Sequence, residues 1–102
     1  MKTLYLILHR EWFDLIASGK KTSEFREYKP YWTIKLQGVA FTEINFKNGY
    51  AKDAPVMRVR LKKIIVREKG EAKPQNGEIL PYKCYELVLG EILEIENWNG
   101  VA

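Results

Sequence analysis

The sequence predicts a mixed α+β fold that is mostly β: a small, strongly curved barrel of about five to six strands with two short helices. Five segments have strand patterns, two have helical spacing, and two of the strands contain a break in phase typical of a β-bulge. Long strands bent at bulges within 102 residues favour a sheet that curls towards closure. With 46% hydrophobic and 29% charged residues, residues 1–102 have the composition of a single globular domain.

The first strand is predicted at residues 3–8, a continuous apolar run of the kind that is buried on both faces. Helical spacing follows over residues 11–18, with Trp12 and Phe13 on the apolar face, where such residues usually belong to the core. Gly19 supplies the left-handed residue that commonly ends a helix. The chain therefore turns at this glycine.

A second strand is predicted at residues 22–27, where strict alternation places Glu24 and Arg26 on one face and Ser23 on the other. Pro30 is well placed in the first turn of a second short helix, which residues 37 and 38 close. A third strand is predicted at residues 39–46, followed by a loop as far as Pro55.

The fourth strand, residues 56–67, has the clearest alternation in the sequence, with apolar residues at 57, 59 and 61. Lys63 then occupies a position reserved for an apolar residue, which predicts a bulge after which Ile64 and Val66 face inward. Residues 68–83 have no period and are predicted to form a loop. A fifth strand covers residues 84–95, with Gly90 at a second bulge or bend.

The composition excludes several classes of protein. Cys84 is the single cysteine and His9 the single histidine, so neither a disulfide within the chain nor a zinc site of known spacing is expected. We expect His9 to be structural, Cys84 to be a small buried hydrophobic residue, and no metal or cofactor. The longest apolar run, residues 4–8, is far shorter than a membrane span of about 18 residues, so we expect a reduced, cytoplasmic protein.

The net charge of +4 is unevenly distributed. Residues 58–69 contain six basic residues and one acidic residue, whereas residues 84–102 contain four glutamates and no Lys or Arg. If the two strands are neighbours, Arg58, Arg60 and Lys62 form cross-strand ion pairs on a solvated face, the interpretation that we favour. If not, these three side chains form a stripe that matches the phosphates of a nucleic acid strand.

The segment after Gly19 concentrates charge at a helix end. Lys21, Glu24 and Arg26 are close enough in sequence to converge on one polar pocket, within about 6 Å of one another. An ordinary charged strand after a helix cap is the simpler interpretation of the same residues.

Four motifs follow one another along the sequence: Gly19-x-Lys21-Thr22-x-Glu24-x-Arg26, then Lys29-Pro30-Tyr31-Trp32, Asn48-Gly49-Tyr50 with Lys52 and Pro55, and Leu87-Val88-Leu89-Gly90-Glu91-Ile92. In this order, and over nearly the whole chain, they resemble the ASCH (ASC-1 homology) domain family. The resemblance implies a PUA-like β-barrel with a cleft between the barrel and the first helix. It also implies that RNA or a nucleotide-like small molecule binds in this basic cleft. The side chains that we expect to bind the ligand are Lys20, Lys21, Glu24, Arg26, Tyr31, Trp32, Tyr50 and Arg58.

Some proteins of this family are enzymes, so the resemblance leaves catalysis open. One branch removes the acyl group of N4-acetylated cytidine with a Lys, a Thr and a Glu, and another is described as a ribonuclease. The Lys of the first branch corresponds to Lys21, but its catalytic Thr falls on Glu24, and a carboxylate does not replace a hydroxyl nucleophile. If the chain is an enzyme, Lys21 and Glu24 are its expected catalytic residues. A protein-interaction module that has kept only the fold is a third possibility.

Overall fold

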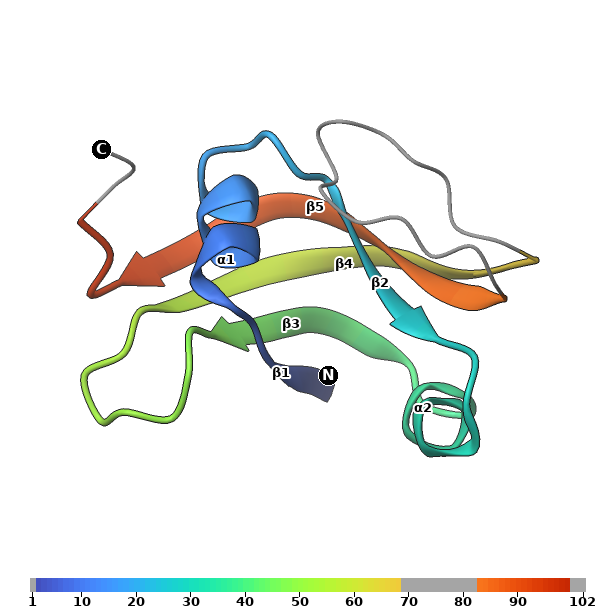
Figure 1. The fold of residues 1–102 in the computed structure, drawn as a ribbon. Coiled ribbons are helices and arrows are strands. Elements are labelled where there is room, and N and C mark those ends of the chain that lie inside the picture. Colours follow the sequence, from blue (N-terminus) through green and yellow to red (C-terminus); the bar gives the residue numbers. More distant parts are fainter. Residues whose placement is uncertain (1, 69–82, 100–102) are drawn as a thin grey trace.

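The computed structural model describes residues 2–68 and 83–99. Over these residues the chain forms β1 (Lys2–Ile7), α1 (Arg10–Ala17), β2 (Ser23–Glu27), α2 (Pro30–Leu36), β3 (Phe41–Lys47), β4 (Val56–Arg67) and β5 (Cys84–Glu96) (Figure 1). Every predicted helix and strand is present, within two residues of its predicted ends. The predicted loop at residues 68–83 lies outside the described part except for its first and last residues.

The strands form one sheet in the order β1-β3-β4-β5-β2. Strand β1 runs parallel to β3, and the other neighbouring strands are antiparallel. The sheet curls into a half-barrel, with α1 over its concave face and α2 at one end (Figure 1). The prediction of a small, mostly β α+β barrel is thus confirmed, with β1 and β2 as the two edges of the sheet.

Both predicted bulges lie in the long β4–β5 hairpin. From Leu61 to Lys63 strand β4 advances two residues while β5 advances one, from Leu89 to Val88, which confirms the predicted bulge in β4. The register also shifts beside Gly90, where a Cβ atom would lie 3.4 Å from the side chain of Arg60. These shifts increase the local twist and help the sheet to curl.

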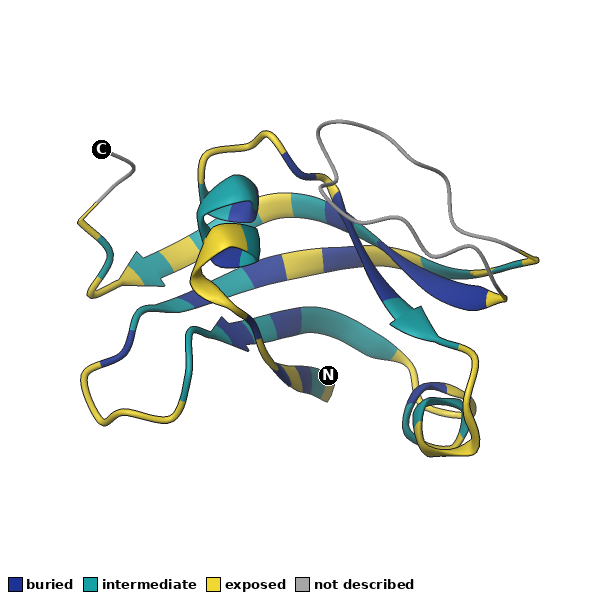
Figure 2. Cartoon of the chain, in the orientation of Figure 1, coloured by how far each residue is buried: buried dark blue, intermediate teal, exposed yellow. Residues whose placement is uncertain are grey.

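The core fills the concave face beneath α1. Figure 2 shows buried and more exposed residues alternating along residues 43–47 of β3 and 56–61 of β4, as expected for strands with one covered face. The largest members of the core are Phe13 of α1, Phe46 of β3 and Tyr85 of β5. The full set of buried core residues is Leu4, Leu6, Leu8, Phe13, Ile16, Leu36, Ile44, Phe46, Met57, Val59, Leu61, Tyr85, Leu87 and Leu89.

Two predictions about burial are wrong. Strand β1 is covered on one face only: Leu4 and Leu6 are buried, whereas Tyr5 between them is 68% exposed. An edge strand has this pattern when no other element packs on its outer face. Ile64 packs against the core as predicted, but Val66, two residues further along β4, is exposed.

Candidate functional site

A cleft of about 180 Å³ lies between the β1–α1 junction and β2. These two segments belong to opposite edges of the sheet, so the cleft occupies the seam of the half-barrel. We call it the seam cleft. It is lined by Ile7, Leu8, His9, Trp12, Glu24, Phe25 and Arg26.

The turn after α1 places Lys21 behind this cleft. Gly19 adopts a left-handed φ of +82°, and the backbone N–H of Lys21 then donates to the carbonyl of Leu15 at 2.9 Å. The chain folds back onto the helix, and the Lys21 side chain becomes fully buried. Its Nζ lies 4.8 Å from the centre of the Trp12 ring, within range of a cation–π interaction.

Glu24 joins two cations. Its Oε1 lies 2.9 Å from Lys21 Nζ and its Oε2 lies 2.8 Å from Arg26 Nη2. Both cations lie within ion-pair distance of Glu24, as predicted, but Lys21 does not line the cleft, so the prediction that all three side chains share one pocket is wrong for Lys21. A carboxylate that is only 2% exposed needs such partners, because an unpaired buried charge is strongly destabilising.

Arg26 spans the seam. Its Nη2 donates to Glu24 and also to the backbone carbonyl of Ile7, at 3.4 Å, while the guanidinium carbon lies 5.0 Å from the centre of the Trp32 ring. The buried Nε of Arg26 has no hydrogen-bond partner among the described residues. One donor of the guanidinium therefore has no acceptor in residues 2–68 and 83–99.

Two of the three charged side chains, Glu24 and Arg26, line the seam cleft, whereas Lys21 pairs with the carboxylate without lining the cleft. The cleft thus presents one acceptor group and one donor group side by side.

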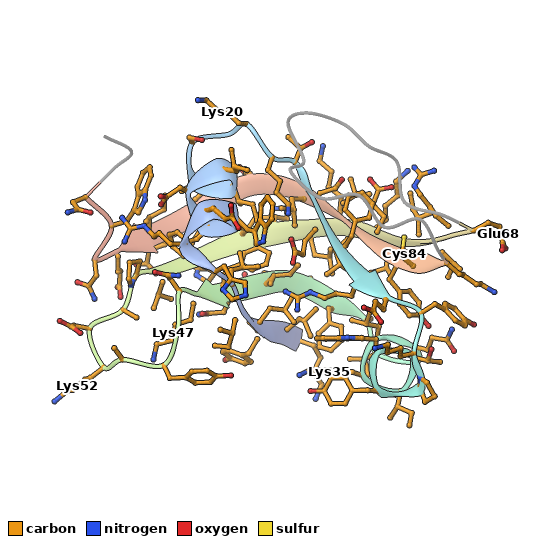
Figure 3. All side chains as sticks on the ribbon, in the orientation of Figure 1. Lys20, Lys35, Lys47, Lys52, Glu68 and Cys84 are labelled. Carbon is orange, nitrogen blue, oxygen red and sulfur yellow. The ribbon has the colours of Figure 1, made fainter. Side chains whose placement is uncertain are left out.

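The other candidate ligand residues lie further away. Lys20 projects from the α1–β2 turn into solvent (Figure 3). Tyr31, 62% exposed, and the partly buried Trp32 belong to α2, beside Arg26. Tyr50 is 86% exposed in the β3–β4 loop, at the other end of β3 from α2. Trp32 thus contacts Arg26, one of the residues that line the cleft.

Arg58 faces outward from β4 and belongs to a set of cross-strand ion pairs. It pairs with Glu43 of β3 at 3.2 Å, and Arg60 pairs with Glu91 of β5 at 2.8 Å. Since β4 and β5 are antiparallel neighbours, these pairs confirm the favoured interpretation of the uneven charge. Lys62 is exposed on the same outward face.

The hydroxyl groups next to Glu24 in sequence do not line the cleft. Ser23 is buried and donates to Glu86 Oε2 at 2.6 Å, and Glu86 also accepts from Arg67. Thr22 is exposed in the turn before β2. Among the seven lining residues there is no Ser, Thr or Cys. Neither the Ser23 nor the Thr22 hydroxyl is therefore placed to act as a nucleophile in the cleft.

Of the seven lining residues, Glu24 and Arg26 were predicted as site residues, whereas Ile7, Leu8, His9, Trp12 and Phe25 were not. Trp12 was expected in the core, but it is only partly buried and contacts both the core and the cleft. His9, expected to be structural, is the exposed residue before α1, and its side chain makes no cap hydrogen bond. No motif signals either residue, because each approaches β2 only through the curl of the sheet.

Residues 2–68 and 83–99 contain no group of three or more His, Cys, Asp or Glu side chains placed to hold a metal ion. Cys84 is buried, as predicted. No helix in this part of the chain is long and apolar enough to cross a membrane.

The fold and site together define a small curled β-domain with a polar cleft at the seam, closed on one side by a helix. Residues 6–101 match the family model of the ASCH domain. The chain therefore belongs to the ASCH domain family. Neither a curated protein nor a solved structure gives a significant match.

Proposed function

We propose that the chain binds a nucleobase in the seam cleft, as part of a free nucleotide or of RNA. The observation that supports this most strongly is the pair of polar groups on the cleft wall, the Glu24 carboxylate and the Arg26 guanidinium, 2.8 Å apart. The edge of a base carries hydrogen-bond donors and acceptors next to each other. A carboxylate accepts from such donors and a guanidinium donates to such acceptors.

The size and walls of the cleft fit the same ligand. At about 180 Å³ it is smaller than the ~300–1,000 Å³ of sites that enclose drug-sized ligands, so it suits one ring-sized group. Trp12 and His9 add aromatic rings to the wall, and aromatic rings stack on bases.

The Arg26 guanidinium on the cleft wall suits a phosphate attached to the base. Its Nε is a donor without a protein partner among the described residues. The ASCH family resemblance, which implies RNA or nucleotide binding, supports the same ligand class.

Binding of the four ribonucleoside monophosphates, measured by isothermal titration calorimetry and by ¹H–¹⁵N NMR, tests the proposal. We expect at least one nucleotide to bind and to shift the Trp12 indole and the amides of residues 7–9 and 24–26. Arg26→Ala should weaken binding at least about tenfold, since a hydrogen bond to a charged group contributes about 1.5–3 kcal/mol.

Arg60→Ala is the matched control. Both arginines pair with a glutamate at 2.8 Å, but Arg60 lies on the outward face of the sheet. Affinity should be unchanged in this variant. Failure of all four nucleotides to bind, or equal losses in the two variants, contradicts the proposal.

A further inference from the structure

A cluster of aromatic and cationic side chains on α2 continues from the seam cleft. We call Tyr31, Trp32 and Lys35 the α2 platform. The rings of Tyr31 and Trp32 meet edge to face, with centroids 4.9 Å apart. The Lys35 ammonium lies 5.5 Å from the first centroid and 5.6 Å from the second. Residues 30–36 include no acidic residue.

Arg26 links this platform to the cleft. Its guanidinium carbon lies 5.0 Å from the centre of the Trp32 ring, and the same side chain lines the cleft. Two contacts of about 5 Å, from Arg26 to Trp32 and from Trp32 to Tyr31, thus join the two surfaces.

Contacts with the sheet hold the helix that carries the α2 platform in place. The Tyr85 hydroxyl, on a residue that is almost completely buried in β5, lies 2.7 Å from Thr33 Oγ1 and accepts a hydrogen bond from Gln37 at 3.2 Å. These contacts fix α2 on the sheet. Tyr31, by contrast, is 62% exposed, so its ring is available to a ligand without rearrangement of the helix.

Resting on the proposed function, we propose that the seam cleft and the α2 platform form one binding surface for a single nucleic acid strand. One base enters the cleft, a base one or two positions further along the strand stacks on Tyr31, and Lys35 contacts a phosphate. The cation beside the rings favours this ligand, because the bases of a nucleic acid strand stack on aromatic rings and its phosphates pair with a lysine. An apolar protein segment would leave the Lys35 charge desolvated and unpaired.

The spacing sets the length of the strand. A stacked strand advances ~3.4 Å per nucleotide, so the two contacts from Arg26 to Tyr31 are spanned by about three stacked nucleotides, or by fewer in an extended strand. A mononucleotide reaches the cleft only, and the proposal therefore predicts that affinity depends on length.

The test compares the tightest-binding mononucleotide with its homo-oligomers of two, three and four residues, by fluorescence anisotropy and calorimetry on the full chain. We expect affinity to rise at least about fivefold between one and three nucleotides, the lower end of the effect of one base–aromatic stack, and to level off at four.

Variants of the platform separate this inference from the proposed function. Tyr31→Ala should abolish the gain with length and leave mononucleotide affinity unchanged, whereas Tyr31→Phe, which keeps the ring, should retain the gain. Lys35→Ala should lower the salt slope of trinucleotide binding by about one unit. Lys52→Ala, which removes an exposed lysine at the opposite end of the molecule, should not (Figure 3).

The outcomes are distinct. If a mononucleotide binds but affinity does not rise with length, the α2 inference is overturned, the proposed function stands, and the exposed Tyr31 and Ile34 remain as a candidate surface for a protein. If Lys52→Ala lowers the slope as much as Lys35→Ala, the inference is also overturned. If no nucleotide binds at all, the proposed function itself fails.

Discussion

The Arg26 side chain donates a hydrogen bond to the backbone carbonyl of Ile7 at 3.4 Å, and this contact joins the two edges of the sheet. In an open sheet of five strands the two edge strands lie far apart. The curl of the β4–β5 hairpin brings them together, and the seam cleft forms where they meet. The long bulged strands therefore determine the position of the site as much as the residues that line it.

Lys21→Met should lower the free energy of unfolding by about 2–4 kcal/mol. The substitution removes one of the two cations that hold the buried Glu24 carboxylate, and a broken buried ion pair typically costs about 3–5 kcal/mol. The expected loss is smaller than this typical cost because Arg26 still pairs with Glu24 in the variant. Urea denaturation measures the change through the transition midpoint at constant m-value.

The double variant Lys21→Met/Glu24→Gln is the control for this prediction. Once the carboxylate is neutral, the loss of the lysine no longer leaves a buried charge underpaired. The double variant should therefore be more stable than the sum of the single effects implies, by about 1 kcal/mol or more. Strict additivity would show that the two side chains are not energetically coupled.

The charged triad was predictable from the sequence because it is local. Gly19 marks the turn, and strict alternation after it places Glu24 and Arg26 on one face of β2. Lys21 lies three residues before Glu24 and Arg26 two residues after it, so both ion pairs of the carboxylate are local in the sequence. The first of the ASCH motifs, residues 19–26, covers the same segment.

The walls of the cleft were not predictable, because they depend on the curl of the sheet. His9 and Trp12 reach Glu24 only after β1 and β2 approach across the seam. The exposure of the outer face of β1 was not predicted, for a related reason. A short apolar run occurs both in central strands and in edge strands, so the sequence does not distinguish the two positions. The exposure of Tyr5 follows only from the order of the strands.

Trp98→Phe should destabilise the protein by about 1–2 kcal/mol. The Trp98 indole N–H donates to Asp14 Oδ1 at 2.9 Å, and this hydrogen bond attaches the segment after β5 to α1. Phenylalanine keeps an apolar ring but has no donor, so it loses a hydrogen bond to a charged acceptor. Thermal unfolding should show a decrease of roughly 4–8 °C per kcal/mol for a domain of this size.

The variant Trp98→Ala separates packing from hydrogen bonding. The Trp98 ring also packs against the core, so alanine should cost more than phenylalanine. Equal melting temperatures for the two variants would mean that the ring contributes no packing energy.

Replacing Arg58, Arg60 and Lys62 together by alanine should leave the affinity for a trinucleotide and its salt slope unchanged. The two arginines are already paired with glutamates on the outward face of the sheet, and exposed charges beyond about 10 Å are screened at physiological salt. Stability should fall by no more than about 1–2 kcal/mol, because exposed ion pairs contribute little. A slope reduced by about three units would assign these side chains to phosphate contacts instead.

The chain should not deacylate N4-acetylcytidine at an ordinary enzymatic rate. A mechanism that uses a hydroxyl nucleophile needs that hydroxyl inside the cleft, and the Ser23 hydroxyl is instead committed to Glu86 at 2.6 Å, while Thr22 faces solvent. The remaining route is a water activated by the Glu24 carboxylate as general base.

Purified protein incubated with N4-acetylcytidine and followed by chromatography tests both routes. We expect no turnover above about 0.01 per second, well below the ~1–10³ per second of typical enzymes. Turnover of several per second that disappears in Glu24→Gln would instead establish the water route, and turnover that disappears only in Thr22→Ala would identify a hydroxyl nucleophile.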